Sequence, residues 1–142
     1  MSTIGVFGAN GRMGRALVTV AKEQNLALTA ATVRIGSALV GVDAGELAGC
    51  GKNQLPLSET SLAQVSQAEV WVDFTMPEPM LEHLALAVKA GKAMVIGVTG
   101  LTDEQYTQIK AASEIIPIVW APNMSVGVNL LLHLVQTAAK VM

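Results

Sequence analysis

The sequence predicts an α/β protein built on a doubly wound parallel sheet. Short runs of apolar and β-branched residues alternate with longer segments of helical spacing along the 142 residues, the order that gives parallel strands joined by helices. Hydrophobic residues make up 51% of the chain and charged residues 14%, which suits strands buried on both faces. A glycine-rich turn also joins the first apolar run to the first helical segment.

The first half of the chain is predicted to place two strands and two helices around an irregular segment. Thr3–Gly8 and Leu26–Thr32 are short apolar runs and are expected to be strands. Arg12–Gln24 is expected to be a helix with one apolar face, formed by Met13, Leu17, Val20 and Ala21. Ile35–Asn53 is rich in glycine and small residues, which predicts a loop. Ser61–Gln67 begins with a Ser-x-x-Gln capping box, which predicts a short helix.

The second half is predicted to alternate regularly. The expected strands are Glu69–Thr75, Ala93–Val98 and Ile116–Ala121, the last with its proline at the start. Pro77–Ala90 is expected to be a helix because prolines suit its first turn and a glycine follows it. Thr102–Ile115 opens with a Thr-x-x-Gln capping box. Val126–Met142 is expected to be a final helix that is apolar on most faces.

Composition and charge exclude several classes of function. A net charge of −2 and an aromatic content of 4% are not the basic surface or the stacking platform of a nucleic-acid-binding protein. The apolar runs fall short of the roughly 20 residues that span a bilayer, so no membrane partner is expected. The start of the chain lacks a basic signal region and Cys50 is the only cysteine, which indicates a cytoplasmic protein.

No metal site is expected either. His83 and His133 stand alone on predicted helices, with no second ligand at metal-binding spacing. Both are expected to be surface or interface residues.

The turn after the first strand carries the strongest functional signal. It reads Gly8, Ala9, Asn10, Gly11, Arg12, Met13 and Gly14. Glycines at this spacing permit a tight turn, a close approach of the backbone to a pyrophosphate and close packing of helix on strand, with the helix N–H groups facing the phosphates. This predicts a Rossmann-like NAD(P)-binding domain. The alternative is a plain strand–turn–helix whose glycines serve packing alone.

The end of the second strand indicates which dinucleotide is preferred. An NAD site expects an acidic residue about 20 residues beyond the glycines. Here Arg34 stands about 20 residues after Gly14, and its segment holds no acid. An arginine there can hold a 2′-phosphate, so NADPH is expected to be preferred over NADH. The alternative is a solvated surface arginine.

Asp73–Glu78, Gly97–Gly100 and Ala121–Ser125 lie where strands are predicted to end, which is the edge at which doubly wound folds bind ligands. The alternative for each segment is a plain turn. Their candidate cofactor contacts are Phe74, Gly97, Val98, Thr99, Ala121, Pro122, Asn123 and Met124. No catalytic acid, base or nucleophile is identified anywhere. The spacing of Tyr106 and Lys110 imitates a Tyr/Lys catalytic pair, but packing is the expected role of Tyr106.

The chain resembles the N-terminal domain of the dihydrodipicolinate reductase (4-hydroxy-tetrahydrodipicolinate reductase) family. The segments that carry the resemblance are Gly8–Arg15, Gly41–Gly49, Val72–Thr75, Val95–Gly100 and Asn123–Asn129. The resemblance implies an NAD(P)H-dependent transfer of hydride to a cyclic imine dicarboxylate in the diaminopimelate route to lysine. It carries the family's cofactor site onto Gly8–Met13, Arg34, Gly97–Thr99 and Ala121–Met124. Val33 stands where the family often has an acid, which again favours NADPH, and Met76 stands where it often has a basic residue.

The resemblance also implies a domain organisation. Residues 1–125 are expected to be the dinucleotide-binding domain, and residues 126–142 the first helix of a substrate domain that is otherwise absent. The acid/base groups of the family and most of its tetramer contacts lie in that second domain, so this chain by itself is expected to bind cofactor and to be inactive. The alternatives are a stand-alone nucleotide- or CoA-binding module and an NADPH-sensing module, both without redox chemistry.

Overall fold

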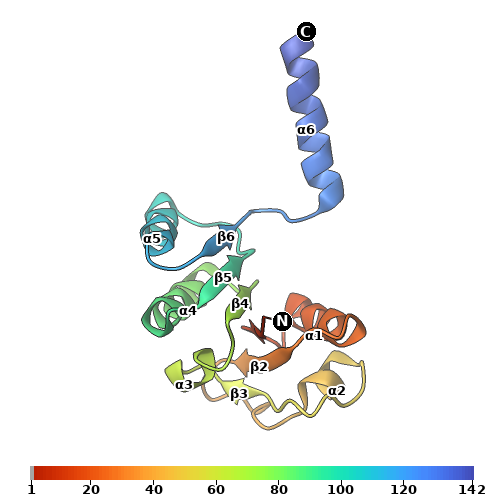
Figure 1. Ribbon diagram of the computed structural model, residues 1–142, viewed down its shortest axis with the longest axis vertical. Coiled ribbons are helices and arrows are strands. Elements are labelled where there is room, and N and C mark those ends of the chain that lie inside the picture. The colour runs from red at the N-terminus through yellow and green to blue at the C-terminus, as the bar shows by residue number, and fades with distance from the viewer. Residues whose placement is uncertain (1) are drawn as a thin grey trace.

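The computed structural model describes residues 2–142 and shows one parallel sheet with helices on both faces (Figure 1). The strands are β1 (Ile4–Val6), β2 (Leu28–Val33), β3 (Ser58–Glu59), β4 (Val70–Asp73), β5 (Ala93–Ile96) and β6 (Ile118–Trp120). The helices are α1 (Arg12–Glu23), α2 (Ala44–Ala48), α3 (Leu62–Val65), α4 (Pro77–Ala90), α5 (Asp103–Ser113) and α6 (Val126–Val141). The sheet has six strands in the order β3-β2-β1-β4-β5-β6, and every pair is parallel.

The predicted doubly wound fold is therefore confirmed. The strand order reverses between β1 and β4, which is the position where this class of sheet leaves room for a ligand at the carboxyl edge. Helices α1 and α2 cover one face, and α3, α4 and α5 cover the other (Figure 1).

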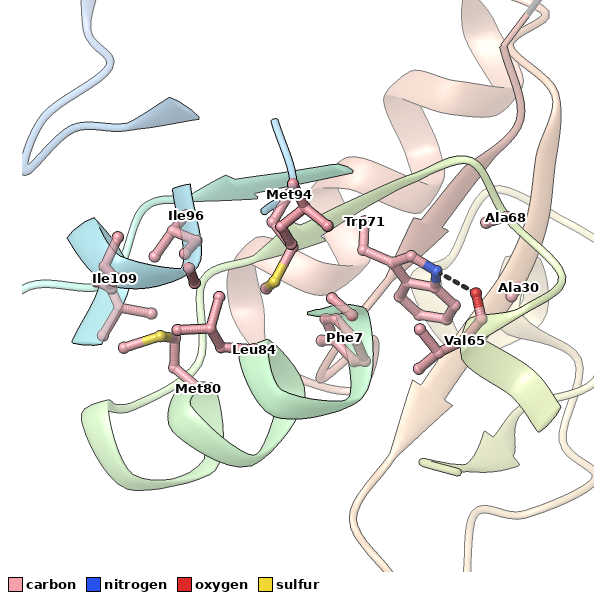
Figure 2. Packing of buried hydrophobic residues seen from close by; sticks show 14 residues of the cluster. Phe7, Ala30, Val65, Ala68, Trp71, Met80, Leu84, Met94, Ile96 and Ile109 are labelled. Atoms are coloured by element: carbon pink, nitrogen blue, oxygen red, sulfur yellow. Dashed lines mark hydrogen bonds between the residues drawn. The ribbon is translucent and has the colours of Figure 1, made fainter. Parts of the chain in front are cut away.

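The two faces enclose separate cores. On the α4 side, Phe7, Trp71, Met80 and Met94 are at most 2% exposed and pack together (Figure 2). The indole N–H of Trp71 donates to the carbonyl of Val65 at 2.9 Å, so the largest buried side chain leaves no polar atom unpaired. On the α1 side, smaller residues such as Val6, Val18 and Val33 form the second core.

Two elements, α2 and β3, were not predicted from the sequence. The expected loop contains α2, which begins at Asp43 as N-cap and ends at Gly49, whose φ of 81° is left-handed. Asp43 accepts from the N–H of Glu46 at 3.0 Å, so an Asp-x-x-Glu start signal was present in the sequence. Strand β3 was not predicted, because two polar residues show no strand pattern and pairing with Thr32 and Val33 alone defines them.

The buried face of α1 also differs from the prediction. Ala21 is buried and Leu17 is half-buried against the core, as predicted, but Met13 and Val20 are 46% and 48% exposed. Gly14 and Val18, which were not predicted to face the core, are buried. A side chain at Gly14 would place its Cβ 2.6 Å from the Cα of Ala9, so only a glycine permits this contact. Close backbone packing at Gly14 therefore determines which face of the helix is buried, even though larger apolar side chains such as Met13 lie beside it.

The last helix is present as predicted, but within residues 2–142 no other element buries any of its side chains. Helix α6 projects away from the sheet (Figure 1), and none of its residues is buried within the part of the chain that the structure describes. Its leucines and valines are exposed, among them Leu131 at 59% and Val135 at 57%. None of the helices in residues 2–142 combines the length and apolar character that crossing a membrane requires.

Candidate nucleotide-binding site

The glycine turn lies at the carboxyl end of β1, at the point where the strand order reverses. Gly8 has a φ of 60°, in the left-handed region that favours glycine, and its carbonyl accepts from the N–H of Gly11 at 2.9 Å. The N–H of Ala9 donates to the carbonyl of Thr32 at 2.9 Å, which ties the turn to β2. The sequence predicted a tight turn at this junction, and the structure has one.

The start of α1 leaves backbone donors open. Gly11 is the N-cap and has no side chain to cap the helix. Arg15 is the first helical residue whose N–H is bonded, to the carbonyl of Gly11 at 3.0 Å. In residues 2–142 the N–H groups of residues 12–14 therefore have no backbone or side-chain acceptor, and they lie at the positive end of the helix dipole.

The glycines of the turn leave room for a pyrophosphate, as the space around a Cβ placed at Gly11 or Gly14 indicates. A Cβ at Gly11 would make one tight contact, 3.3 Å from the carbonyl oxygen of Gly8, and no other described heavy atom outside its chain neighbours would lie within 4 Å of it, so the outer side of the turn is open. A Cβ at Gly14 would collide with the backbone of Ala9. Gly11 thus keeps the surface of the turn accessible, and Gly14 holds the helix against the strand, as the two roles require.

Two adjoining cavities share Arg34 and His83 in their lining, and the smaller one borders the turn. The larger, about 590 Å³, is mainly apolar and is lined by Arg34, Ile35 and Pro79, among others. The smaller, about 170 Å³, is lined by Gly8, Asn10 and Arg34 as well. Arg34 borders both and forms no ion pair in the described residues. The guanidinium is therefore free to meet an anion beside the glycine turn.

A buried hydrogen-bonded group lies against the same cavities. Nδ1 of His83 is 2.6 Å from Oδ2 of Asp73 at the end of β4, and His83 also lines both cavities. His83 is only 7% exposed, so the expectation of a surface or interface histidine was wrong. Asp73 offered a signal, because a lone carboxylate in an otherwise apolar strand requires partners when it is buried.

The ends of β5 and β6 continue the same edge of the sheet. The N–H of Gly97 donates to the carbonyl of Asp73 at 2.9 Å, and the ring of Phe74 lies over Gly97 where any side chain would collide with it. A cavity of about 320 Å³ is lined by Thr99 and Pro122 together with the tilted ring pair of Tyr106 and Trp120. Tyr106 thus has the packing role expected from the sequence.

Some polar groups of the predicted contact segment Ala121–Met124 already form hydrogen bonds within the chain. The N–H of Ala121 donates to the carbonyl of Ile96 at 3.2 Å. The carbonyl of Asn123 accepts from Asn129 at 3.0 Å, and its side-chain oxygen accepts from the N–H of Ser125 at 2.8 Å. The N–H of Ala121 is thus unavailable to a bound carboxamide, whereas the carbonyl of Asn123 retains a second lone pair.

The predicted cofactor-binding residues differ in their exposure to solvent. The exposed ones are Gly11, Arg12, Met13, Arg34, Thr99, Pro122, Asn123 and Met124. The half-buried ones are Gly8, Asn10, Phe74, Gly97 and Ala121. Ala9 and Val98 are buried, so they can meet a ligand only through their backbone. Across residues 2–142, no three His, Cys, Asp or Glu side chains are grouped as metal ligands.

A family model described as "Dihydrodipicolinate reductase, N-terminus" matches residues 2–124. The chain belongs to this family. The chain is 48% identical, over its full length, to 4-hydroxy-tetrahydrodipicolinate reductase of Pseudoalteromonas atlantica and covers 54% of that protein. It is 49% identical over 99% of its length to the enzyme of the same name from Hahella chejuensis, covering 53% of that protein. The chain thus spans about half the length of these curated relatives.

One solved structure agrees with this assignment, and a second shares the fold. Dipicolinate-bound dihydrodipicolinate reductase from Paenisporosarcina superposes with a TM-score of 0.70 at 26% identity, over 98% of this chain and 54% of that one. An amine dehydrogenase from Mycobacterium smegmatis superposes with a TM-score of 0.69 at 17% identity, over 84% of this chain and 38% of that one. The second likeness extends to the fold alone.

Proposed function

We propose that this chain is the NAD(P)H-binding part of a 4-hydroxy-tetrahydrodipicolinate reductase. The observation that carries the proposal is the glycine turn at the switch point of the sheet, beside three helix N–H groups and an arginine side chain that have no partner among residues 2–142. Backbone donors and a helix dipole at this place form the usual binding site of a pyrophosphate in this class of sheet.

The proposed contacts divide the edge of the sheet into two parts. The backbone of Gly8–Met13 would hold the pyrophosphate, and Arg34 would meet the phosphate or ribose of the adenosine half. Phe74, Gly97–Thr99 and Ala121–Met124 would hold the nicotinamide half. The two parts lie on either side of the switch point, at the ends of β1 and β2 and of β4, β5 and β6.

When bound, NAD(P)H would supply a hydride for the reduction of a dihydrodipicolinate-type cyclic imine in lysine (diaminopimelate) biosynthesis. The residues of this chain would bind and orient it, and no group among them is assigned to proton transfer. We propose that residues 1–125 form the dinucleotide domain and that residues 126–142 begin the substrate domain, which would supply the catalytic groups. The whole protein is proposed to be a cytoplasmic homotetramer.

Arg34 favours NADPH as the preferred cofactor. Its exposed guanidinium borders both cavities, and a doubly charged 2′-phosphate forms charge-assisted hydrogen bonds with arginine. A 2′-hydroxyl gains much less from the same group. NADH would bind the rest of the site equally well.

Titration of the chain with NADPH, NADH and CoA by calorimetry tests the proposal. NADPH is expected to bind tightest, and NADH binding about tenfold tighter would overturn the preference. CoA binding tighter than both would favour the nucleotide- or CoA-binding module. Binding of NADPH by a full-length protein that reduces no imine would favour the NADPH-sensing module.

Two matched arginine variants then locate the 2′-phosphate. Arg34→Ala is expected to weaken NADPH about tenfold and to leave NADH almost unchanged. Arg12→Ala, at the pyrophosphate turn, is expected to weaken both dinucleotides alike. Equal losses of both dinucleotides in Arg34→Ala would remove Arg34 as the 2′-phosphate ligand.

A further inference from the structure

One buried carboxylate connects the end of β4, helix α4 and the glycine turn. Oδ1 of Asp73 accepts from the N–H of Thr75 at 2.8 Å and from its hydroxyl at 2.6 Å. Oδ2 is 2.6 Å from Nδ1 of His83, in the second turn of α4. Asp73 is fully buried, and its carboxylate has three donors.

The first arm of this arrangement reaches Gly8 through Thr75. Because the hydroxyl of Thr75 is bonded to Asp73, the rotamer of its β-branched side chain is fixed. The methyl group then faces the turn, since a Cβ at Gly8 would lie 2.6 Å from Cγ2 of Thr75. The orientation of Thr75 therefore limits the space in which the backbone of Gly8 can move.

The second arm reaches Phe7, the residue before Gly8, through His83. The ring of His83 stacks on the ring of Phe7 with centroids 4.0 Å apart and planes 2° apart. Phe7 in turn stacks on Trp71 at 4.2 Å, and its N–H donates to the carbonyl of Val72 at 3.0 Å. Both residues that lead into the phosphate turn are thus held by side chains bonded to Asp73.

Stability alone gives no reason for a carboxylate here. Removing a charge from water is costly, and an apolar side chain could fill the position of Asp73, as Trp71 fills the other buried position of β4. The three donors offset that cost only while they stay in place. The carboxylate thus fixes the geometry of its partners, and those partners border the turn proposed to hold the pyrophosphate.

We propose that Asp73 and His83 form a positioning pair that holds Phe7 and Thr75 so that the Gly8–Gly11 turn is preorganised for a dinucleotide. This inference rests on the proposed function. Nδ1–H of His83 donates to the carboxylate of Asp73. Tight dinucleotide binding depends on this hydrogen bond more than on the imidazole ring itself.

His83→Leu and His83→Asn separate the bond from the ring. Leucine retains apolar bulk against Phe7 and removes the donor, whereas the amide N–H of asparagine can take the place of Nδ1–H. Calorimetric titration of the chain with NADPH and NADH is expected to show about tenfold weaker binding for His83→Leu. His83→Asn is expected to stay within about twofold of the unaltered chain.

The stoichiometry and the thermal midpoint exclude a merely structural effect. Loss of folded chains lowers the number of sites per chain, whereas loss of positioning raises the Kd of sites that are still present. Unchanged affinity in His83→Leu, or equal losses in both variants, would overturn the inference. If the unaltered chain bound neither dinucleotide, the proposed function would be lost first and this inference with it.

Thr75 provides a second test if His83→Leu does not fold. Thr75→Val keeps the branched shape and the methyl group toward Gly8, and it removes only the hydroxyl donor to Asp73. Binding about tenfold weaker in Thr75→Val than in the unaltered chain is expected. Unchanged affinity in Thr75→Val would contradict a role for the Asp73 bond.

Discussion

Helices α4 and α6 are both apolar, but only α4 packs against the sheet and buries side chains. Helix α4 has 14 residues and buries Met80, His83, Leu84 and Ala87, whereas α6 has 16 residues and buries none. Their sequences would suit a core equally well, so apolar content alone does not decide burial. What differs is position, because α4 connects two neighbouring strands and α6 follows the edge strand β6.

The largest expected effect breaks this comparison directly. Met80→Ala, at a fully buried position of α4, is expected to lower the free energy of unfolding by about 2–5 kcal/mol through lost contacts and a cavity. Leu131→Ala, at a 59% exposed position of α6, is expected to change it by less than about 0.5 kcal/mol. Urea unfolding of both variants measures the difference, and similar losses would show that α6 is packed in solution.

Glycines in two helices sharpen the comparison at an intermediate scale. Gly14→Ala forces a Cβ against the backbone of Ala9 and is expected to cost roughly 1–3 kcal/mol. In Gly127→Ala, the new Cβ in α6 would meet only Ser125 Oγ, at 3.9 Å. This substitution is expected to stabilise the helix by up to about 1 kcal/mol, because alanine has the higher helix propensity. Circular dichroism with thermal unfolding distinguishes these opposite signs. A neutral Gly14→Ala would contradict close packing at the turn.

The smallest expected effect concerns the stability of helix α2 at low pH. Partial burial raises the pKa of Asp43, but hydrogen bonds from the N–H groups of Glu46, Asn53 and Gln54 outweigh it and lower the pKa below 3.8. A carboxylate with a lowered folded-state pKa contributes stability above its unfolded pKa and loses it as the pH falls through the folded one.

Asp43→Asn is therefore expected to remove a small part of the acid sensitivity. The thermal midpoint of the unaltered chain should fall more steeply below about pH 3.8 than that of Asp43→Asn. Differential scanning calorimetry between neutral pH and pH 3 follows both proteins. Parallel curves would show that these hydrogen bonds contribute no pH-dependent stability.

Local signals made most of the fold predictable. The alternation of apolar runs with helical segments, the capping box of Thr102 and Gln105, and Gly91 after α4 all mark elements that the structure contains. The glycine turn was equally readable, because its spacing and its place between strand and helix are both local. Such features depend on neighbours a few residues apart, which the sequence states directly.

The sequence by itself thus determined the class of sheet, the family and the turn proposed to bind phosphate. Only the tertiary structure decided which face of α1 is buried, that Asp73 and His83 meet, and that α6 packs against nothing in the described residues. Asp73 and His83 lie in different elements, and a close contact at Gly14 outweighs larger apolar neighbours. Burial depends on which surfaces the strand order brings together, and a hydrophobic pattern cannot specify that.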